Sequence, residues 1–272
     1  MFCCAFGAGR RRVVQERMSS EADSNLMEAR MSVEAEPKLS VVVVDPHQDD
    51  EMNCLGTLLK CRERGDVVTM VAVSSGEKGG WYLNLPQEQV AEARRDEASR
   101  VAEGLGGEYV CLGAEDMFIQ DTPELRMSLV RVLRRVAADV VITVPPNDYS
   151  LDHVTTSQVA TQAALLSAVP TLKTDEPALR RPPALFFMDT ITGLDSQPTV
   201  YVDITEQFER KCELLRLHDS QMVNLKNFAG FDLAEYADVV NRFRGLQVGV
   251  AYAEGFRPAM RNPLIRAGAI LP

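Results

Sequence analysis

Hydrophobic residues after position 38 alternate between short continuous runs and runs with helical spacing. Val41–Val44 is a continuous β-branched run, which is typical of a strand buried on both faces. Residues 52–59 then place Met and Leu at helical spacing, and Gly65 stands where a helix would end. The same alternation predicts further strands at residues 67–73, 109–112 and 140–144, and helices at residues 87–105 and 124–136.

Strands that alternate with helices across short connections require parallel strands and right-handed crossovers. We therefore expect an α/β fold: a Rossmann-like, doubly wound, mostly parallel sheet with helices on both faces. Two more strands (184–188 and 199–203) and two helices (206–218 and 233–244) are predicted in a C-terminal subregion that begins near residue 184. Residues 39–272 are thus expected to form a single catalytic domain, whose ligand binds beyond the carboxyl ends of the strands.

The first 38 residues do not share this alternation. Arg10, Arg11 and Arg12 follow a short apolar stretch, whereas a secretory signal carries its basic residues before a longer one. The rest of the segment is acidic and rich in Met. We expect residues 1–38 to be a disordered or loosely docked leader. Six cysteines without a C-x-x-C pair agree with reduced thiols in a cytoplasmic protein.

The charge of the chain limits the ligands that it can take. The 272 residues have a formal net charge of −10, so a nucleic-acid backbone would be repelled overall. No segment approaches the roughly 20 apolar residues that cross a bilayer. We therefore expect a small-molecule ligand, with no nucleic acid and no membrane span.

The segment Asp45–Glu51 directly follows the first predicted strand and carries most of the candidate chemistry. It contains the imidazole of His47 and three consecutive carboxylates. A hydrolytic zinc site needs three protein ligands, an open position for water, and a nearby carboxylate to take the proton of that water. Acidic residues also favour the first turn of a helix, which would explain the carboxylates but not His47.

Histidine is scarce, since only His47, His153 and His218 occur in the chain. His153 ends a predicted loop at residues 145–153, after which Thr155 is expected to begin a helix with a capping box. A parallel sheet would bring His47 and His153 to the same edge, and this favours a metal site. For His218 two alternatives stay open, a cap at a helix end or a wall of the active site.

These motifs resemble the PIG-L/LmbE family, zinc-dependent de-N-acetylases of N-acetylglucosamine conjugates. The first motif is similar to the family's Pro-His-Pro-Asp-Asp-Glu signature, with Gln48 in place of the second proline. The pair Asp152-His153 is similar to the family's late Asp-His pair. The resemblance extends from about Leu39 to Arg257, and its other matching segments are Ser75–Glu77, Arg94–Ala98, Val202–Thr205, His218–Gln221 and Tyr252–Phe256.

The resemblance implies roles for individual residues. Three side chains would hold one zinc ion per chain: His47, Asp50 and His153. Asp49 would be the general base, Arg94 would hold substrate, and Asp152 would support the site. Zinc lowers the pKa of bound water from 15.7 toward about 7, which allows hydroxide to attack an acetamide carbonyl. The resemblance also implies a homo-oligomer.

Ser150 departs from the family pattern. A histidine commonly stands three residues before the last ligand, as an oxyanion stabiliser or a proton donor to the leaving amine. Serine can donate a hydrogen bond but cannot supply a proton near neutral pH. Tyr149, Asp152 and His218 are the candidates to compensate. Trp81, the only tryptophan, is expected either to stack on a sugar or to pack against the protein.

Several functions are compatible with these residues. The leading hypothesis is a deacetylase of an N-acetylated amino sugar or its conjugate. A thiol-conjugate amidase, or an amidase for a larger acyl group, is an alternative with the same fold. A catalytically weak protein that binds metal and sugar is an alternative from another class, which Ser150 favours and the intact Asp49 disfavours. A nucleotide-binding protein is disfavoured because no Gly-rich phosphate loop follows Val44.

Overall fold

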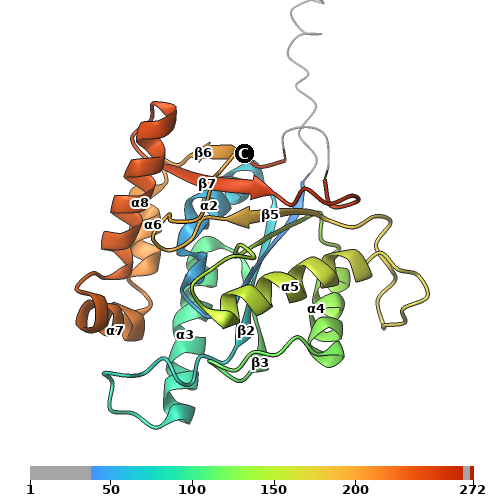
Figure 1. Ribbon diagram of the computed structural model, residues 1–272, viewed down its shortest axis with the longest axis horizontal. Helices are drawn as coiled ribbons and strands as arrows, with labels where there is room; N and C mark the ends of the chain where they lie inside the picture. The colour runs from blue at the N-terminus through green and yellow to red at the C-terminus, as the bar shows by residue number, and fades with distance from the viewer. Residues whose placement is uncertain (1–37, 266–269) are drawn as a thin grey trace, which may run out of the picture. The chain divides into compact units, whose positions relative to one another are not determined.

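The computed structural model describes residues 38–265 and 270–272. The predicted leader, residues 1–38, lies outside this part of the chain except for Lys38. The described residues form one seven-stranded sheet with the strand order β3-β2-β1-β4-β5-β7-β6 (Figure 1). Its strands are β1 (Ser40–Asp45), β2 (Val67–Ser74), β3 (Glu108–Ala114), β4 (Val140–Thr143), β5 (Ala184–Met188), β6 (Val200–Asp203) and β7 (Ala253–Pro258).

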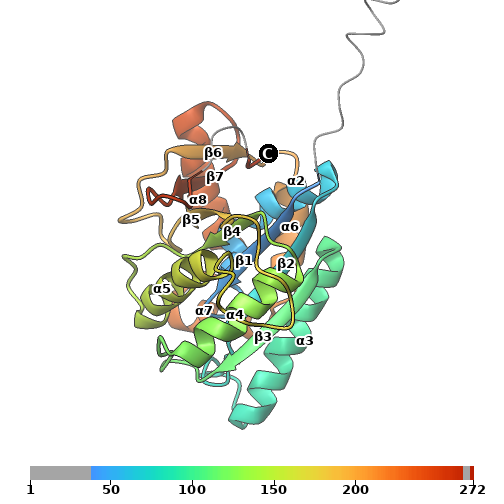
Figure 2. The same cartoon turned by 90° about the vertical axis from the view of Figure 1, so that its right-hand side faces the viewer.

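The sheet is mostly parallel, as the sequence predicts. Strands β1 to β5 pair in parallel, and only β7 runs antiparallel, between β5 and β6. The helices are η1 (Asp50–Asn53, a 3-10 helix), α2 (Leu55–Arg64), α3 (Gln87–Leu105), α4 (Pro123–Arg135), α5 (Leu151–Leu166), α6 (Phe208–Leu215), α7 (Asp219–Ala229) and α8 (Leu233–Val248). In both views α4 and α5 lie on one side of the sheet, and α3 and α6 lie on the other (Figure 1, Figure 2). The doubly wound α/β fold is therefore confirmed.

The valine run of β1 packs into both layers of the core. Val41 and Val43 belong to a hydrophobic cluster that includes residues of α2, α3, α6 and α8. Val42 and Val44 belong to a second cluster, formed with residues of α4 and α5. Burial on both faces explains why this strand lacks polar residues at alternate positions.

Three local predictions were wrong. Helix α5 begins at Leu151, so His153 lies in its first turn and not in a loop, and Thr155 lies inside the helix. A carboxylate in the first turn of a helix interacts favourably with the helix dipole, and Asp152 lies in that turn when the helix begins at Leu151. The capping box predicted at Thr155 therefore does not mark the start of the helix. The helix predicted at residues 206–218 ends at Leu215, and a separate helix, α7, follows.

No sequence pattern predicts strand β7. Its residues, Ala253–Pro258, contain Glu254, Gly255 and Arg257, so neither a continuous hydrophobic run nor a clear alternation marks the strand. The strand is formed because its backbone pairs with both β5 and β6. In the described part of the chain, no helix combines the length and the apolar character needed to cross a membrane.

Candidate active site

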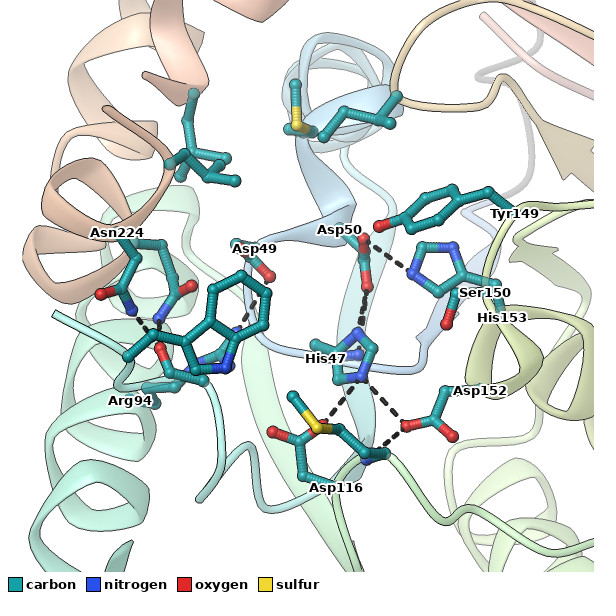
Figure 3. Close-up of a pocket in the computed structure, with 18 of the residues that line it drawn as sticks. His47, Asp49, Asp50, Arg94, Asp116, Tyr149, Ser150, Asp152, His153 and Asn224 are labelled. Carbon is teal, nitrogen blue, oxygen red and sulfur yellow. Dashed lines mark hydrogen bonds and ion pairs between the residues drawn. The ribbon is translucent and has the colours of Figure 1, made fainter. Parts of the chain in front are cut away.

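A cavity of about 270 Å³ opens where β1, β2, β3 and β4 end (Figure 3). Nine of the ten side chains predicted for the site line it: His47, Asp49, Asp50, Trp81, Arg94, Tyr149, Ser150, Asp152 and His153. The tenth, His218, is not part of the described lining. The parallel sheet thus brings together residues that are up to about a hundred positions apart, as expected for the carboxyl edge of a doubly wound fold.

His47, Asp50 and His153 form a compact donor set. One Asp50 oxygen lies 3.2 Å from Nδ1 of His47, and the other lies 3.6 Å from Nε2 of His153. One ligand atom from each of the three residues lies within 4.8 Å of the others. Two imidazole nitrogens and one carboxylate oxygen are a usual donor set for hydrolytic zinc, with a fourth position left for water. The three residues therefore fit a divalent metal.

The backbone explains how these three side chains meet. Strands β1 and β4 are neighbours in the sheet, and the segments that follow them carry the two parts of the donor set. After β1 the chain turns sharply at Asp49, whose φ is 141°, and enters the 3-10 helix that carries Asp50. After β4 a short loop leads into α5, whose first turn carries His153. Neighbouring strands and two tight connections thus set the spacing of the ligands.

Two further carboxylates, those of Asp116 and Asp152, contact the ring nitrogen of His47 that faces away from Asp50. Nε2 of His47 is 3.1 Å from Oδ1 of Asp116 and 3.3 Å from Oδ2 of Asp152 (Figure 3). Asp152 in turn accepts hydrogen bonds from the backbone N–H groups of Met117 (2.7 Å) and Ile119 (3.1 Å). A histidine that binds a metal usually directs its other nitrogen to a carboxylate, which fixes the tautomer and the ring orientation. Asp116 and Asp152 occupy that position for His47.

His153 has an equivalent partner. Its Nδ1 is 3.1 Å from Oδ2 of Asp148, whose side chain is almost fully buried. Asp148 lies in the loop between β4 and α5, and sequence reasoning did not single it out. Asp116 was not predicted either, although its place two positions after β3 was a usable signal. Both candidate metal-binding histidines are therefore held by carboxylates on the side away from Asp50.

Asp49 is held by Arg94. One guanidinium nitrogen of Arg94 donates to Oδ1 of Asp49 (3.0 Å) and to the backbone oxygen of Gln48 (2.9 Å). Burial, the largest effect, raises the pKa of Asp49 to about 6, and the positive charge of Arg94 limits the rise. A carboxylate with a pKa near neutrality can both accept and return a proton at physiological pH. Arg94 thus contacts the candidate base, in addition to lining the cavity.

The loop after β2 forms another wall. The side chains of Gln221 and Asn224 on α7 both donate to the backbone oxygen of Gly79. A Cβ at Gly79 would overlap a guanidinium nitrogen of Arg94, so only glycine fits there without displacing Arg94. The same loop presents Trp81, which is 53% exposed and contacts the ring of Phe228 edge to face, with centroids 5.1 Å apart.

The remaining predicted residues lie at the rim or behind the site. Tyr149 is exposed at the cavity and its ring centroid is 5.3 Å from that of His153. Ser150 is the N-cap residue of α5, but within the described structure its side chain makes no capping hydrogen bond. His218 is fully buried at the start of α7, and Nε2 lies 2.6 Å from Oε1 of Glu51. Its side chain therefore supports the turn that contains Asp49 and Asp50.

Comparisons with known proteins agree with this architecture. Residues 42–164 match the model of the family described as PIG-L, GlcNAc-PI de-N-acetylase. The chain is 25% identical over 235 residues to a diacetylchitobiose deacetylase of Thermococcus kodakarensis, covering 80% of this chain and 82% of that protein. It is 25% identical over 239 residues to a 4-oxalmesaconate hydratase of Pseudomonas putida, covering 81% of this chain and 89% of the hydratase. An N,N'-diacetylchitobiose deacetylase structure from Pyrococcus horikoshii has the same fold, with a TM-score of 0.72, 24% identity, and coverage of 88% and 92% of the two chains.

Proposed function

Since residues 42–164 form a PIG-L family domain, we propose that this chain is a zinc-dependent hydrolase that removes an acyl group, with acetyl as the leading case, from the amine of an N-acetylated amino sugar or its conjugate. Deacetylase and hydratase relatives support an enzyme of this family. The observation that carries the proposal is the donor set of His47, Asp50 and His153, which lies beside Asp49 in a cavity at the carboxyl edge of the sheet.

The chain's own residues divide the work of amide hydrolysis. A zinc ion held by the three ligands would act as a Lewis acid that polarises the carbonyl and acidifies water. Asp49 accepts the proton of the attacking water, and Arg94 fixes the Asp49 carboxylate for this transfer. Because burial raises the pKa of Asp49, the protonated Asp49 can then return the proton to the leaving amine. This second transfer replaces the proton donor that Ser150 cannot provide.

The charges in the cavity favour a neutral substrate over a polyanion. Among the described residues of the lining, Arg94 is the only arginine or lysine, and Asp49 already occupies its guanidinium. Four carboxylates line the same cavity: Asp49, Asp50, Asp116 and Asp152. Even with a divalent metal bound, they disfavour a substrate with several negative charges. An N-acetylated sugar does not carry this electrostatic cost.

A hydratase is the second candidate. The curated hydratase relative matches this chain at the same identity as the deacetylase does. A base such as Asp49 could activate water for addition to a carbon–carbon double bond, and that reaction needs no proton donor for a leaving amine. A hydratase would therefore not need a histidine at the position of Ser150. The acidic lining is the feature that favours the deacetylase.

The deciding experiment uses purified protein that is stripped with a chelator and reloaded with zinc. It is assayed against N-acetylglucosamine, its oligomers and glycosides, a thiol conjugate, and 4-oxalmesaconate, the unsaturated tricarboxylate named for the hydratase relative. Zinc-dependent release of free amine from an acetylated sugar would support the proposal. Turnover of the tricarboxylate alone would favour the hydratase in its place. Size-exclusion chromatography of the same sample tests the predicted homo-oligomer.

A further inference from the structure

One wall of the cavity is hydrophobic. Four of its lining residues belong to, or pack against, a single core cluster: Met52, Ile191, Leu225 and Leu233. They come from the 3-10 helix, the loop after β5, α7 and α8, so the wall is built from four separate segments. It belongs to the packed interior of the protein, and we name it the apolar wall.

The apolar wall is anchored by two buried side chains and lies beside the candidate metal ligands. Met52 and Leu233 are 3% and 1% exposed, while Ile191 and Leu225 are partly buried and pack against the same cluster. Met52 follows Asp50 by only two positions and shares its 3-10 helix. Well-packed side chains such as Met52 and Leu233 cannot turn away to expose polar groups. A ligand that fills the cavity must therefore place apolar surface against them, or leave them facing water.

The carboxylates Asp116 and Asp152 lie below Asp49 and Asp50 in Figure 3. Hydrocarbon side chains and one thioether lie above Asp49 and Asp50, and a second thioether lies beside Asp116. The amide side chains of Gln221 and Asn224 add polar groups to the lining from α7. An amide held beside Asp49 and the donor set would have two substituents, the sugar on nitrogen and the chain on the carbonyl carbon. The sugar hydroxyls would have hydrogen-bond partners among the carboxylates and amides of the lining. This leaves the chain on the carbonyl carbon to face the apolar wall.

From this geometry we infer that the site takes N-acyl groups of several carbons, and that the apolar wall selects for them. The inference rests on the proposed amide hydrolysis. Water adds to the carbonyl carbon, the carbon–nitrogen bond breaks, the amine takes the proton, and a short-chain carboxylate leaves. The single methyl of an acetyl group would cover only a small part of a wall made of four side chains.

The test compares zinc-loaded wild-type protein on N-acetyl-, N-butanoyl- and N-octanoyl-glucosamine, with release of free glucosamine as the readout. Each methylene that becomes buried should raise kcat/KM by up to about fourfold, so butanoyl should exceed acetyl by about tenfold. The octyl glycoside of N-acetylglucosamine is measured in parallel. It carries the same apolar chain on the sugar and not on the amide.

Two wall variants and one control complete the design. Ile191→Ser and Leu225→Ser should each lower the butanoyl-to-acetyl ratio of kcat/KM by about fivefold or more. Leu246→Ser removes a leucine of α8 that is 78% exposed and lies outside the cavity, and it should leave the ratio unchanged.

A wild-type kcat/KM that falls with acyl length would overturn the inference but not the deacetylase. A gain with the octyl glycoside alone would also overturn it, because the wall would then hold the aglycone. No hydrolysis of any amide by zinc-loaded protein would overturn the proposed function as well.

Discussion

His218 and Glu51 form a fully buried pair beneath the active site. Nε2 of His218 lies 2.6 Å from Oε1 of Glu51, and the two side chains are 0% and 2% exposed. The other Glu51 oxygen accepts a hydrogen bond from the backbone N–H of Asp49 at 3.0 Å. Asp49 has a φ of 141°, a conformation that residues other than glycine rarely adopt and that costs free energy. The pair thus stabilises the strained turn that presents Asp49 to the cavity.

His218→Gln should therefore lower kcat much more than it changes KM. The substitution breaks the contact with Glu51 and lets the Asp49 turn relax, and a misplacement of about 1 Å can cost about 100-fold in rate. We expect a 10- to 100-fold loss of kcat with zinc still bound. Steady-state kinetics and elemental analysis on the same sample check this. Loss of zinc along with activity would instead make His218 a general support of the fold.

His47→Ala and His153→Ala should each lose most bound zinc. Each variant removes one of three protein ligands, and the remaining two cannot hold the metal tightly. Elemental analysis of dialysed protein measures the zinc content, and wild type should carry one zinc per chain. His218→Gln is the matched control, because it alters the third histidine without removing a ligand. Undiminished zinc in both alanine variants would contradict the assignment of His47 and His153 as zinc ligands.

Asp49→Asn should keep zinc and fold but lose most hydrolysis. The amide has nearly the same shape as the carboxylate but cannot accept the proton of the attacking water. General-base contributions are on the order of 10²–10⁴-fold, and we expect a loss of kcat in that range. Turnover and zinc content are measured together. Near-normal turnover by a fully metallated variant would rule out Asp49 as the base.

Asp148→Asn should weaken zinc binding without removing a ligand. The substitution replaces the carboxylate that orients His153, and such supporting groups typically change metal affinity by about 10- to 100-fold. Competition with a fluorescent chelator measures the zinc dissociation constant. Asp219→Asn is the control, since Asp219 has a 75% exposed side chain on α7 and lies outside the cavity. Equal affinities for the two variants would contradict a role for Asp148 in orienting His153.

Ser150→His should raise deacetylation of N-acetylglucosamine. Ser150 lines the cavity next to the donor set, so an imidazole there could donate to the carbonyl oxygen and protonate the leaving amine. One oxyanion donor is worth roughly 10²–10³-fold in a well-studied protease, and we expect a gain of about tenfold or more. Ser150→Ala, which removes the hydroxyl, should show no gain. If Ser150→His improves no acetamide and loses activity on another amide, serine is an adaptation to that other substrate.

Much of the fold could be predicted from the sequence because the patterns that mark its strands and helices are local. The valines of β1 show burial on both faces within four consecutive positions, and Gly65 ends α2 in the left-handed conformation that favours glycine. Strand β7 could not be predicted in this way. Its own side chains carry no clear pattern, and it becomes a strand only because β5 and β6 offer backbone partners on both sides.

The sequence by itself determined that His47 and His153 belong to one edge of the sheet, because the segments that carry them follow predicted strands whose carboxyl ends share that edge. Asp50 as the third candidate ligand came from the family resemblance. Only the tertiary structure decided what supports these residues. Asp116 meets His47 across the edge of the sheet, and Glu51 meets His218 across 167 positions of chain. Such contacts depend on which strands are neighbours and on how each loop turns. No spacing along the chain encodes them, so they become visible only once the chain is folded.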